Sequence, residues 1–211
     1  MCGSKCARTP IPLFGRRTGK AVIMAEVAAE DTASVRAGAR TDTAEGTAAG
    51  PTAGGARYEP FYVERGEGFP LVLLHGNGES HEYFVHQIEH FSRSWRVIAL
   101  DTRGHGRSPR GDGEFTIARF AEDLRDFLTA RGIRRAHLLG FSDGGNIALQ
   151  FALDHREMVG RLVLNGANLF PAGVKRSVQI PIEVEYRLLK PFAGVSERAR
   201  RKTELLGLMV N

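Results

Sequence analysis

The stretch LLGFSDGGNIALQFAL, residues 138–153, changes its hydrophobic pattern part of the way along. Its first part is apolar, as in a strand that is buried on both faces of a sheet. Its second part spaces the apolar residues as in a helix with one buried side. Between the two parts, residues 140–144 read GFSDG and fit the pattern G-x-S-x-G. This pattern predicts a tight turn from strand to helix, with Ser142 at its tip.

Ser142 is the candidate nucleophile, because such a turn exposes a serine oxygen above the sheet. The flanking glycines have a physical reason, since a strand and a helix that meet this closely leave no room for side chains. The start of the helix also places backbone N–H groups and the positive end of its dipole beside the serine oxygen. The alternative is a serine that serves only as the N-cap of the helix.

Outward from this turn, buried strands alternate with amphipathic helices. The residue pattern predicts strands in EPFYVERG, FPLVLLHG, WRVIALD, RAHLLG and VGRLVLN, and helices over His81–Phe91, after the cap residue Thr116, over Gly144–His155, near Glu183–Leu189 and near Ser196–Met209. The fold class is therefore α/β, with a mostly parallel sheet covered by helices on both faces. In such a sheet, sites lie at the carboxyl ends of the strands.

Two further loops follow buried strands at that end of the sheet. The loop HGNGES, residues 75–80, lies where an oxyanion hole needs a second donor, so the backbone N–H groups of Asn77 and Asp143 are the candidates. A glycine-rich turn of purely structural use is the alternative. In the loop DTRGHGRS, residues 101–108, we expect a turn held by a charge pair between Asp101 and Arg103, and no catalytic role for His105.

Together, LLHGNGES, DTRGHGRS, GFSDGGNIAL and LVLNGANLFPAGVK resemble the α/β-hydrolase family over residues 58–211. The resemblance implies the α/β-hydrolase sheet, a nucleophile elbow at Ser142 and a triad in the order serine, acid, histidine. It also implies no metal or other cofactor, and hydrolysis of a small acyl substrate, most often an ester, as in an esterase or lipase. A serine rather than an aspartate at position 142 argues against the haloalkane-dehalogenase type.

Asp143 departs from the commoner family pattern, in which the residue after the nucleophile is neutral. A carboxylate beside an oxyanion site opposes the negative charge that develops there. We therefore expect the side chain to point away, or to pair with a cation or with the helix N-terminus. Its charge would discourage anionic substrates.

The other two members of the triad have no match in the chain. No histidine follows His155, and no strand-like segment follows Asn165. His81 and His105 would lie near the C-terminal rim of the sheet, but we do not expect either of them to replace the triad histidine. We interpret residues 58–211 as a truncated α/β-hydrolase domain, with a core over 58–170 and the start of a cap over 171–211. The last strands would be missing, which leaves LVLN at an open sheet edge.

Three functions therefore stay open. The first is a serine hydrolase whose triad acid and histidine lie outside this chain. The second is a catalytically inactive or ligand-binding α/β-hydrolase-like fragment. The third is cofactor-free haloperoxidase or perhydrolase chemistry at the same serine.

Residues 1–57 form the other predicted region, a disordered or low-complexity extension, because residues 33–57 are rich in Ala, Gly and Thr without apolar periodicity. Both cysteines, Cys2 and Cys6, lie here, so no disulfide or thiolate metal site is expected in the remainder. No apolar run is long enough to span a membrane, and no basic cluster predicts nucleic-acid binding. The expectation is a cytoplasmic protein, although residues 1–25 weakly resemble a targeting peptide; the oligomeric state is open.

Overall fold

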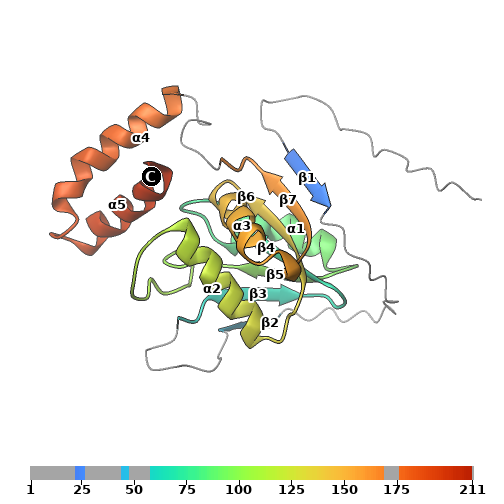
Figure 1. Ribbon diagram of the computed structural model, residues 1–211. Helices are drawn as coiled ribbons and strands as arrows, with labels where there is room; N and C mark the ends of the chain where they lie inside the picture. Colours follow the sequence, from blue (N-terminus) through green and yellow to red (C-terminus); the bar gives the residue numbers. More distant parts are fainter. Residues whose placement is uncertain (1–21, 27–43, 48–57, 169–175, 211) are drawn as a thin grey trace, which may run out of the picture.

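The computed structural model describes residues 22–26, 44–47, 58–168 and 176–210. These residues contain one seven-stranded sheet in the order β1-β7-β6-β4-β5-β3-β2 (Figure 1). The strands are β1 (Val22–Glu26), β2 (Ala44–Thr47), β3 (Phe61–Arg65), β4 (Pro70–Leu74), β5 (Arg96–Leu100), β6 (Ala136–Phe141) and β7 (Val159–Asn165). The four central strands β7, β6, β4 and β5 run parallel, and β1, β2 and β3 pair antiparallel with their neighbours. The predicted, mostly parallel sheet is confirmed.

Helices cover both faces of this sheet. They are the 3₁₀ segments η1 (His81–Phe84), η2 (Arg156–Met158) and η4 (Lys190–Phe192), and the α-helices α1 (Val85–Phe91), α2 (Ile117–Ala130), α3 (Asp143–Asp154), α4 (Arg176–Leu189) and α5 (Glu197–Val210). Side chains of β4 alternate between two cores, as the two-residue period of a strand requires. Leu71 and Leu73 pack with residues of η1 and α1, whereas Val72 and Leu74 pack with α2 and α3.

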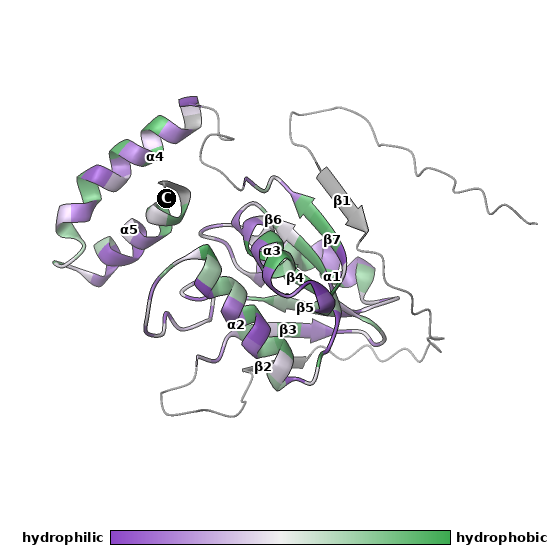
Figure 2. Ribbon diagram, viewed as in Figure 1, coloured by the Kyte–Doolittle hydropathy of each residue, from purple (hydrophilic) through white to green (hydrophobic). Residues whose placement is uncertain are grey.

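The helix α2 shows how the pattern of the sequence produces packing. Thr116 has extended backbone angles, and its hydroxyl accepts a hydrogen bond from the N–H of Arg119 at 3.1 Å, which caps the helix as predicted. Its buried face carries Phe120, Leu124, Phe127 and Leu128, at the spacing of an amphipathic helix, together with Ala121 and Asp123. In Figure 2, α2 accordingly alternates between hydrophobic and hydrophilic residues.

The loop after β5 differs from the prediction. Asp101 and Arg103 do not pair with each other in the part of the chain that is described. Instead, the fully buried carboxylate of Asp101 accepts the N–H of His81 at 2.6 Å and that of Arg107 at 2.8 Å. Arg103 extends toward α2 and binds Asp123 with two hydrogen bonds of 2.7 Å. The loop therefore folds around the Asp101 carboxylate, and the Arg103 side chain points to α2 instead.

The sequence predicts a disordered or low-complexity extension over residues 1–57, and the structure describes two short segments of this region. Two parts of it form strands: β1 pairs with β7 from Arg161 to Asn165, and β2 pairs with β3. The β7 edge, which the sequence predicts to be open, is thus occupied along that stretch. Main-chain pairing needs an extended backbone but no particular side chain, so even the segment AEGT of β2 can join an edge. The remainder of residues 1–57 lies outside the described residues.

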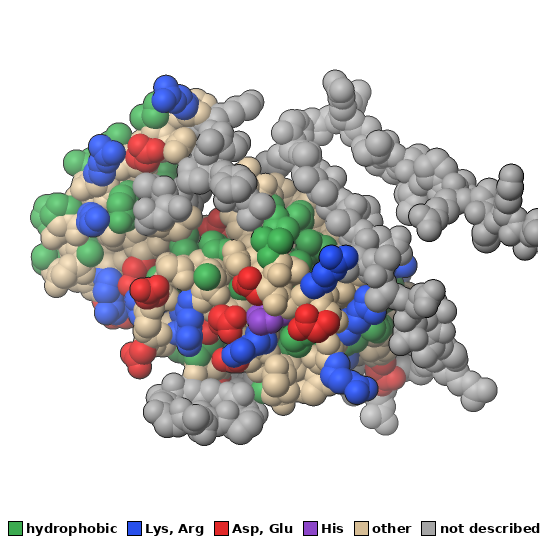
Figure 3. All heavy atoms as spheres, in the orientation of Figure 1, with side chains coloured by type: hydrophobic (Ala, Val, Ile, Leu, Met, Phe, Trp, Pro, Cys, Tyr) green, Lys and Arg blue, Asp and Glu red, His purple; other side chains and the backbone are tan. Residues whose placement is uncertain are grey.

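The helices α4 and α5 lie to one side of the sheet in Figure 1 and pack against each other. The α5 helix is tied to the loop after β5, because Arg110 donates to Glu204 at 2.9 Å, and Thr203 is buried. The outer surface of α4 exposes the apolar residues Ile180, Val184 and Leu188. Elsewhere on the face in Figure 3, acidic and basic side chains are interspersed. None of the helices in the described ranges has the length and apolarity needed to cross a bilayer.

Candidate active site

Ser142 lies at the turn between β6 and α3, with φ of 52° and ψ of −119°. It is the only described residue other than glycine with a positive φ. Three hydrogen bonds hold this backbone in place: the N–H of Ser142 donates to the carbonyl of Asn165 at 2.8 Å, and its own carbonyl accepts from Gly145 and Asn146. The Ser142 hydroxyl makes no capping hydrogen bond to the helix. The geometry is therefore that of a strained turn that presents a free hydroxyl.

The glycines around Ser142 are required by crowding, as the sequence analysis expected. A Cβ atom on Gly140 would lie 2.3 Å from the carbonyl oxygen of Gly144. A Cβ atom on Gly144 would lie 2.0 Å from the carbonyl oxygen of Leu74. Because both neighbours are backbone atoms, they cannot rotate away as a side chain could. The two glycines let α3 approach β4 and β6 closely enough to place Ser142 at the end of the sheet.

The loop after β4 packs directly against Ser142. A Cβ atom on Gly76 would lie 3.2 Å from the Cβ of Ser142, and the N–H of Gly76 donates to the carboxylate of Glu79 at 3.0 Å. The next residue, Asn77, and the first residue of α3, Asp143, are the two predicted oxyanion donors. Within the described residues, neither of their backbone N–H groups takes an intramolecular acceptor. Both donors are thus available to a ligand beside Ser142.

The Asp143 side chain is buried rather than exposed, at 8% of its full accessibility. The side-chain amide of Asn146 donates to its Oδ1 at 3.4 Å, while Oδ2 is buried without a hydrogen-bond partner among the described atoms. Burial raises the pKa of Asp143 from 3.8 to about 6, against an opposing effect of the Asn77 and Asn146 side chains. Of the three expected arrangements, pairing with a cation is not present in the described part of the chain.

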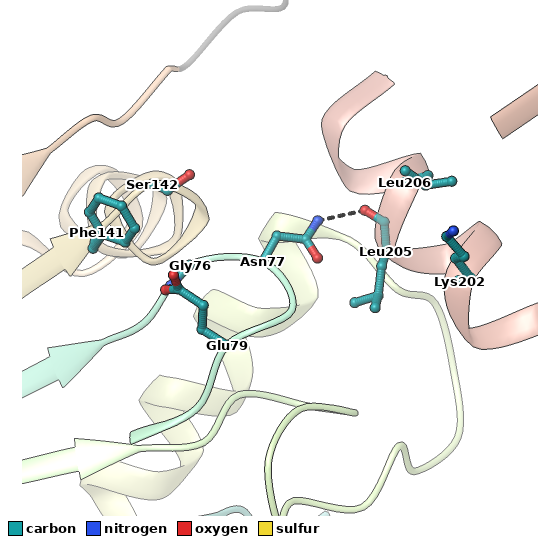
Figure 4. Close-up of a pocket in the computed structure, with 8 residues that line it drawn as sticks. All are labelled: Gly76, Asn77, Glu79, Phe141, Ser142, Lys202, Leu205 and Leu206. Carbon is teal, nitrogen blue, oxygen red and sulfur yellow. Dashed lines mark hydrogen bonds between the residues drawn. The ribbon is translucent and has the colours of Figure 1, made fainter. Parts of the chain in front are cut away.

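A pocket opens above Ser142, with a volume of about 290 Å³. Its lining residues come from the loop after β4, from the turn at Ser142 and from α5; they are Gly76, Asn77, Glu79, Phe141, Ser142, Lys202, Leu205 and Leu206 (Figure 4). The side-chain amide of Asn77 donates to the carbonyl of Leu205 at 2.6 Å and so joins two walls of the pocket. The lining is mostly apolar, with Glu79 and Lys202 as its ionisable side chains.

No described histidine forms a hydrogen bond with Ser142. His75 has a structural role, because its Nε2 accepts the N–H of Thr102 at 3.0 Å, so its Nδ1 carries the proton and donates to the carbonyl of Gly76 at 2.8 Å. Burial lowers the pKa of His75, which keeps the ring neutral. The ring therefore joins the loops that follow β4 and β5.

The other candidate histidines are also engaged elsewhere. His81 donates from Nδ1 to Asp101 at 2.8 Å. His105 is 2% exposed and lies against Thr102 and the carbonyl of Arg103, and burial lowers its pKa to about 4. These contacts agree with the expectation that neither residue replaces the triad histidine.

Sequence reasoning placed residues 171–211 at the start of a cap over the site, but it missed the part that Glu79 and Lys202 take in the pocket. Glu79 lies inside the HGNGES loop, but a glutamate after a glycine-rich turn has no signal that separates a pocket residue from a solvated one. In the run RARRK, residues 198–202, Arg198, Arg200 and Arg201 are exposed as on a solvated helix face, yet Lys202 also lines the pocket. A helical projection of residues 197–208 would place Lys202, Leu205 and Leu206 on one side.

Comparisons with known proteins agree with this geometry. Residues 70–204 match the family described as alpha/beta hydrolase fold. The chain is 34% identical over 127 residues to the soluble epoxide hydrolase of Corynebacterium sp. (strain C12), covering 60% of this chain and 44% of that protein. It is 40% identical over 115 residues to 2-hydroxymuconate semialdehyde hydrolase of Pseudomonas putida, covering 53% of this chain and 41% of that protein.

Among solved structures, Est816, described as an N-acyl homoserine lactone degrading enzyme, is similar with a TM-score of 0.56 and 27% identity. That match covers 76% of this chain and 64% of Est816. The family match spans more than half of the chain, so this chain belongs to the α/β hydrolase fold family, and the relatives named here are hydrolases. The matched part spans less than half the length of the two curated relatives.

Proposed function

We propose that this chain is a serine hydrolase of the α/β-hydrolase family that acts on carboxylic esters or related acyl compounds. The observation that carries the proposal is the strained backbone of Ser142, whose hydroxyl lies in the lining of a mostly apolar pocket. Strain at a non-glycine residue is kept only where the surrounding structure enforces it, and it is concentrated at functional sites. The lactone-degrading activity of the similar Est816 supports an ester, because a lactone is a cyclic ester.

In the proposed reaction, the Ser142 oxygen attacks the acyl carbonyl, and the carbonyl oxygen becomes negatively charged. The backbone N–H groups of Asn77 and Asp143 would donate to this oxygen. One such donor contributes on the order of 3 kcal/mol to the stability of the transition state. The proton of the Ser142 hydroxyl requires a base, and the histidines described above are committed to other partners. The proposed base is therefore a histidine outside residues 58–210, oriented by a carboxylate that is also outside them.

The pocket limits the substrate. Its volume of about 290 Å³ fits a small acyl compound, and Leu205 and Leu206 of α5 would contact the apolar part of that compound. We assign α4 and α5 to the beginning of a cap over the site, because α5 supplies one wall of the pocket. The hydrogen bond between Asn77 and Leu205 would then hold this wall against the loop after β4.

Covalent labelling with an activated phosphonate tests the nucleophile. The expected result is one label on Ser142 in the wild-type chain and none on Ser142→Ala. Added imidazole should raise the labelling rate, because it can serve as the missing base. The matched control is Ser108→Ala, because Ser108 is buried and hydrogen-bonded to the backbone of Asp101, and it should not alter the label. A folded wild-type chain that remains unlabelled, with and without imidazole, would contradict the proposal.

A non-catalytic, ligand-binding α/β-hydrolase-like protein is the second candidate. One observation favours it, namely that Ser142 lacks a histidine partner among the described residues. Such a protein would bind small esters without consuming them. Saturable binding of an ester to a folded chain that neither hydrolyses it nor accepts a phosphonate would decide for this candidate.

A further inference from the structure

Glu79 is a pocket carboxylate that the proposed reaction does not use. A Cβ atom on Gly76 would lie 3.0 Å from Oε2 of Glu79 and 3.2 Å from both Phe141 and Ser142. The carboxylate, the ring and the serine thus all surround one point above Gly76. Figure 4 shows the Glu79 carboxylate next to Gly76 on the wall formed by the loop after β4. A ligand bound at Ser142 lies within reach of this charge.

The charge of Glu79 is not neutralised by the described residues. Its described hydrogen bond is the one that Oε2 accepts from the N–H of Gly76 at 3.0 Å, and a carboxylate can accept several more. Lys202, the cation of the same pocket, forms an ion pair with Glu185 of α4. Among the described residues, the Glu79 carboxylate therefore has no counter-charge, whereas the Lys202 ammonium group is already paired.

We propose that Glu79 selects acyl substrates that carry an ammonium group, with the apolar part of the substrate against Leu205 and Leu206. The proposal rests on the proposed function, because it names the substrate class of the same site. A carboxylate in a partly enclosed apolar pocket attracts a cation more strongly than one in open water does. The same charge would repel anionic esters, so a single residue would set both preferences.

A matched set of reactive probes tests the preference. The probes are p-nitrophenyl methylphosphonates whose second ester group is 3,3-dimethylbutyl, 2-(trimethylammonio)ethyl or 3-carboxypropyl. With each probe, a bond forms between Ser142 Oγ and phosphorus, the bond to p-nitrophenolate breaks, and the serine proton passes to imidazole in the buffer. The rate is read from the released p-nitrophenolate. The first two probes have nearly the same shape, so their ratio reports charge.

We expect the cationic probe to label Ser142 about fivefold faster than its neutral isostere at low salt, with the anionic probe slowest. The ratio should fall as salt screens the charge. In Glu79→Gln the ratio should approach one, because glutamine has no charge but its oxygen can still accept from the N–H of Gly76. Glu82→Gln is the matched control, since Glu82 is an exposed acid in the neighbouring η1 and should leave the ratio unchanged. A ratio of one in the wild type would overturn the proposal, as would a preference that survives Glu79→Gln.

A binding experiment separates this inference from the proposed function. The Ser142→Ala variant is titrated with 2-(trimethylammonio)ethyl acetate and with 3,3-dimethylbutyl acetate, and binding is followed by NMR chemical shifts. Tighter binding of the cationic acetate, lost in Ser142→Ala/Glu79→Gln, supports the ammonium site. If, in addition, no probe labels the wild type, the hydrolase proposal fails while the ammonium site stands. Equal binding of the two acetates overturns the ammonium site even when Ser142 is labelled.

Discussion

The N–H of Ser142 donates to the carbonyl of Asn165 over 2.8 Å, which joins the turn after β6 to the last residue of β7. This bond fixes the peptide on one side of Ser142, and the first turn of α3 fixes the other side. The strained φ of 52° is therefore imposed by the two elements that meet there. The strain has a measurable effect on stability.

Ser142→Gly should stabilise the fold by about 1 kcal/mol relative to Ser142→Ala, because glycine adopts a positive φ without the steric cost that a Cβ atom brings. Both variants lack the hydroxyl, so their difference isolates the backbone. Urea unfolding of the two variants measures it. If the glycine variant proved less stable than the alanine variant, the backbone of Ser142 would carry no strain.

Gly144→Ala should destabilise the protein by about 3 kcal/mol or prevent folding, because the new Cβ atom would collide with the carbonyl of Leu74. The matched control is Gly207→Ala in α5, where the nearest atom to a new Cβ is 3.5 Å away, on Tyr186. There alanine should stabilise the helix by up to about 1 kcal/mol. Thermal unfolding of both variants would give opposite signs, and equal effects would contradict the crowding argument.

Arg103→Met should cost about 3 kcal/mol, because it leaves the carboxylate of Asp123 buried with its main partner removed. The comparison is Arg125→Met, which breaks an exposed contact with Asp126 of the same length, 2.7 Å. This second change should cost less than about 0.5 kcal/mol. Chemical denaturation checks both values. Similar losses for the two variants would mean that burial of the Arg103 pair does not govern its contribution.

Asp143→Asn should make the fold more stable at neutral pH and change the pH dependence of stability. The pKa of Asp143 is raised from 3.8 to about 6 by burial, so the folded protein holds its proton more tightly than the unfolded chain does. The stabilisation from this proton is complete below pH 3.8 and is lost as the pH rises through about 6, a change on the order of 3 kcal/mol. The variant should lack this decline.

The measurement for Asp143 is the free energy of unfolding from pH 3.5 to 7.5 for the wild type and Asp143→Asn. Other groups titrate in the same window, and the lowered pKa of His105 gives the opposite slope, since the unfolded chain then binds the extra proton. The difference between the two proteins removes these common contributions. A difference that stays constant with pH would exclude a shifted Asp143 carboxyl.

Most of the sheet and its helices could be predicted from the sequence because their signals are local. The apolar runs of β4 to β7, the spacing of Phe120, Leu124 and Phe127, and the cap at Thr116 each lie within one element. The turn at Ser142 could also be predicted, because its G-x-S-x-G pattern is local, although the atom that excludes a side chain at Gly144 belongs to the distant Leu74. The boundaries were less accurate, since α4 begins at Arg176, before Pro181, rather than near Glu183.

The contacts between distant segments could not be predicted in this way. Arg103 has a closer acidic neighbour in the sequence, Asp101, than its partner Asp123, and only the path of the loop decides between them. The pairing of β1 with β7 and of β2 with β3 depends on free backbone groups at the sheet edges. Such groups leave no pattern in the side chains of β1 or β2. The contact of Asn77 with Leu205 joins a loop and a helix that are far apart in the chain.

The pairing of β1 with β7 has a consequence for the order of folding. The N-terminal strand leaves the ribosome first, but its partner Arg161–Asn165 belongs to β7, the last of the four parallel strands to be made. Contacts this far apart in sequence form late, because closing a long loop has an entropic cost before any pairing repays it. During synthesis the segment Val22–Glu26 must therefore stay unpaired until β7 has been made, and the β7 edge stays exposed until the two strands pair. This interval, rather than the finished fold, is when the chain is most open to association with other chains.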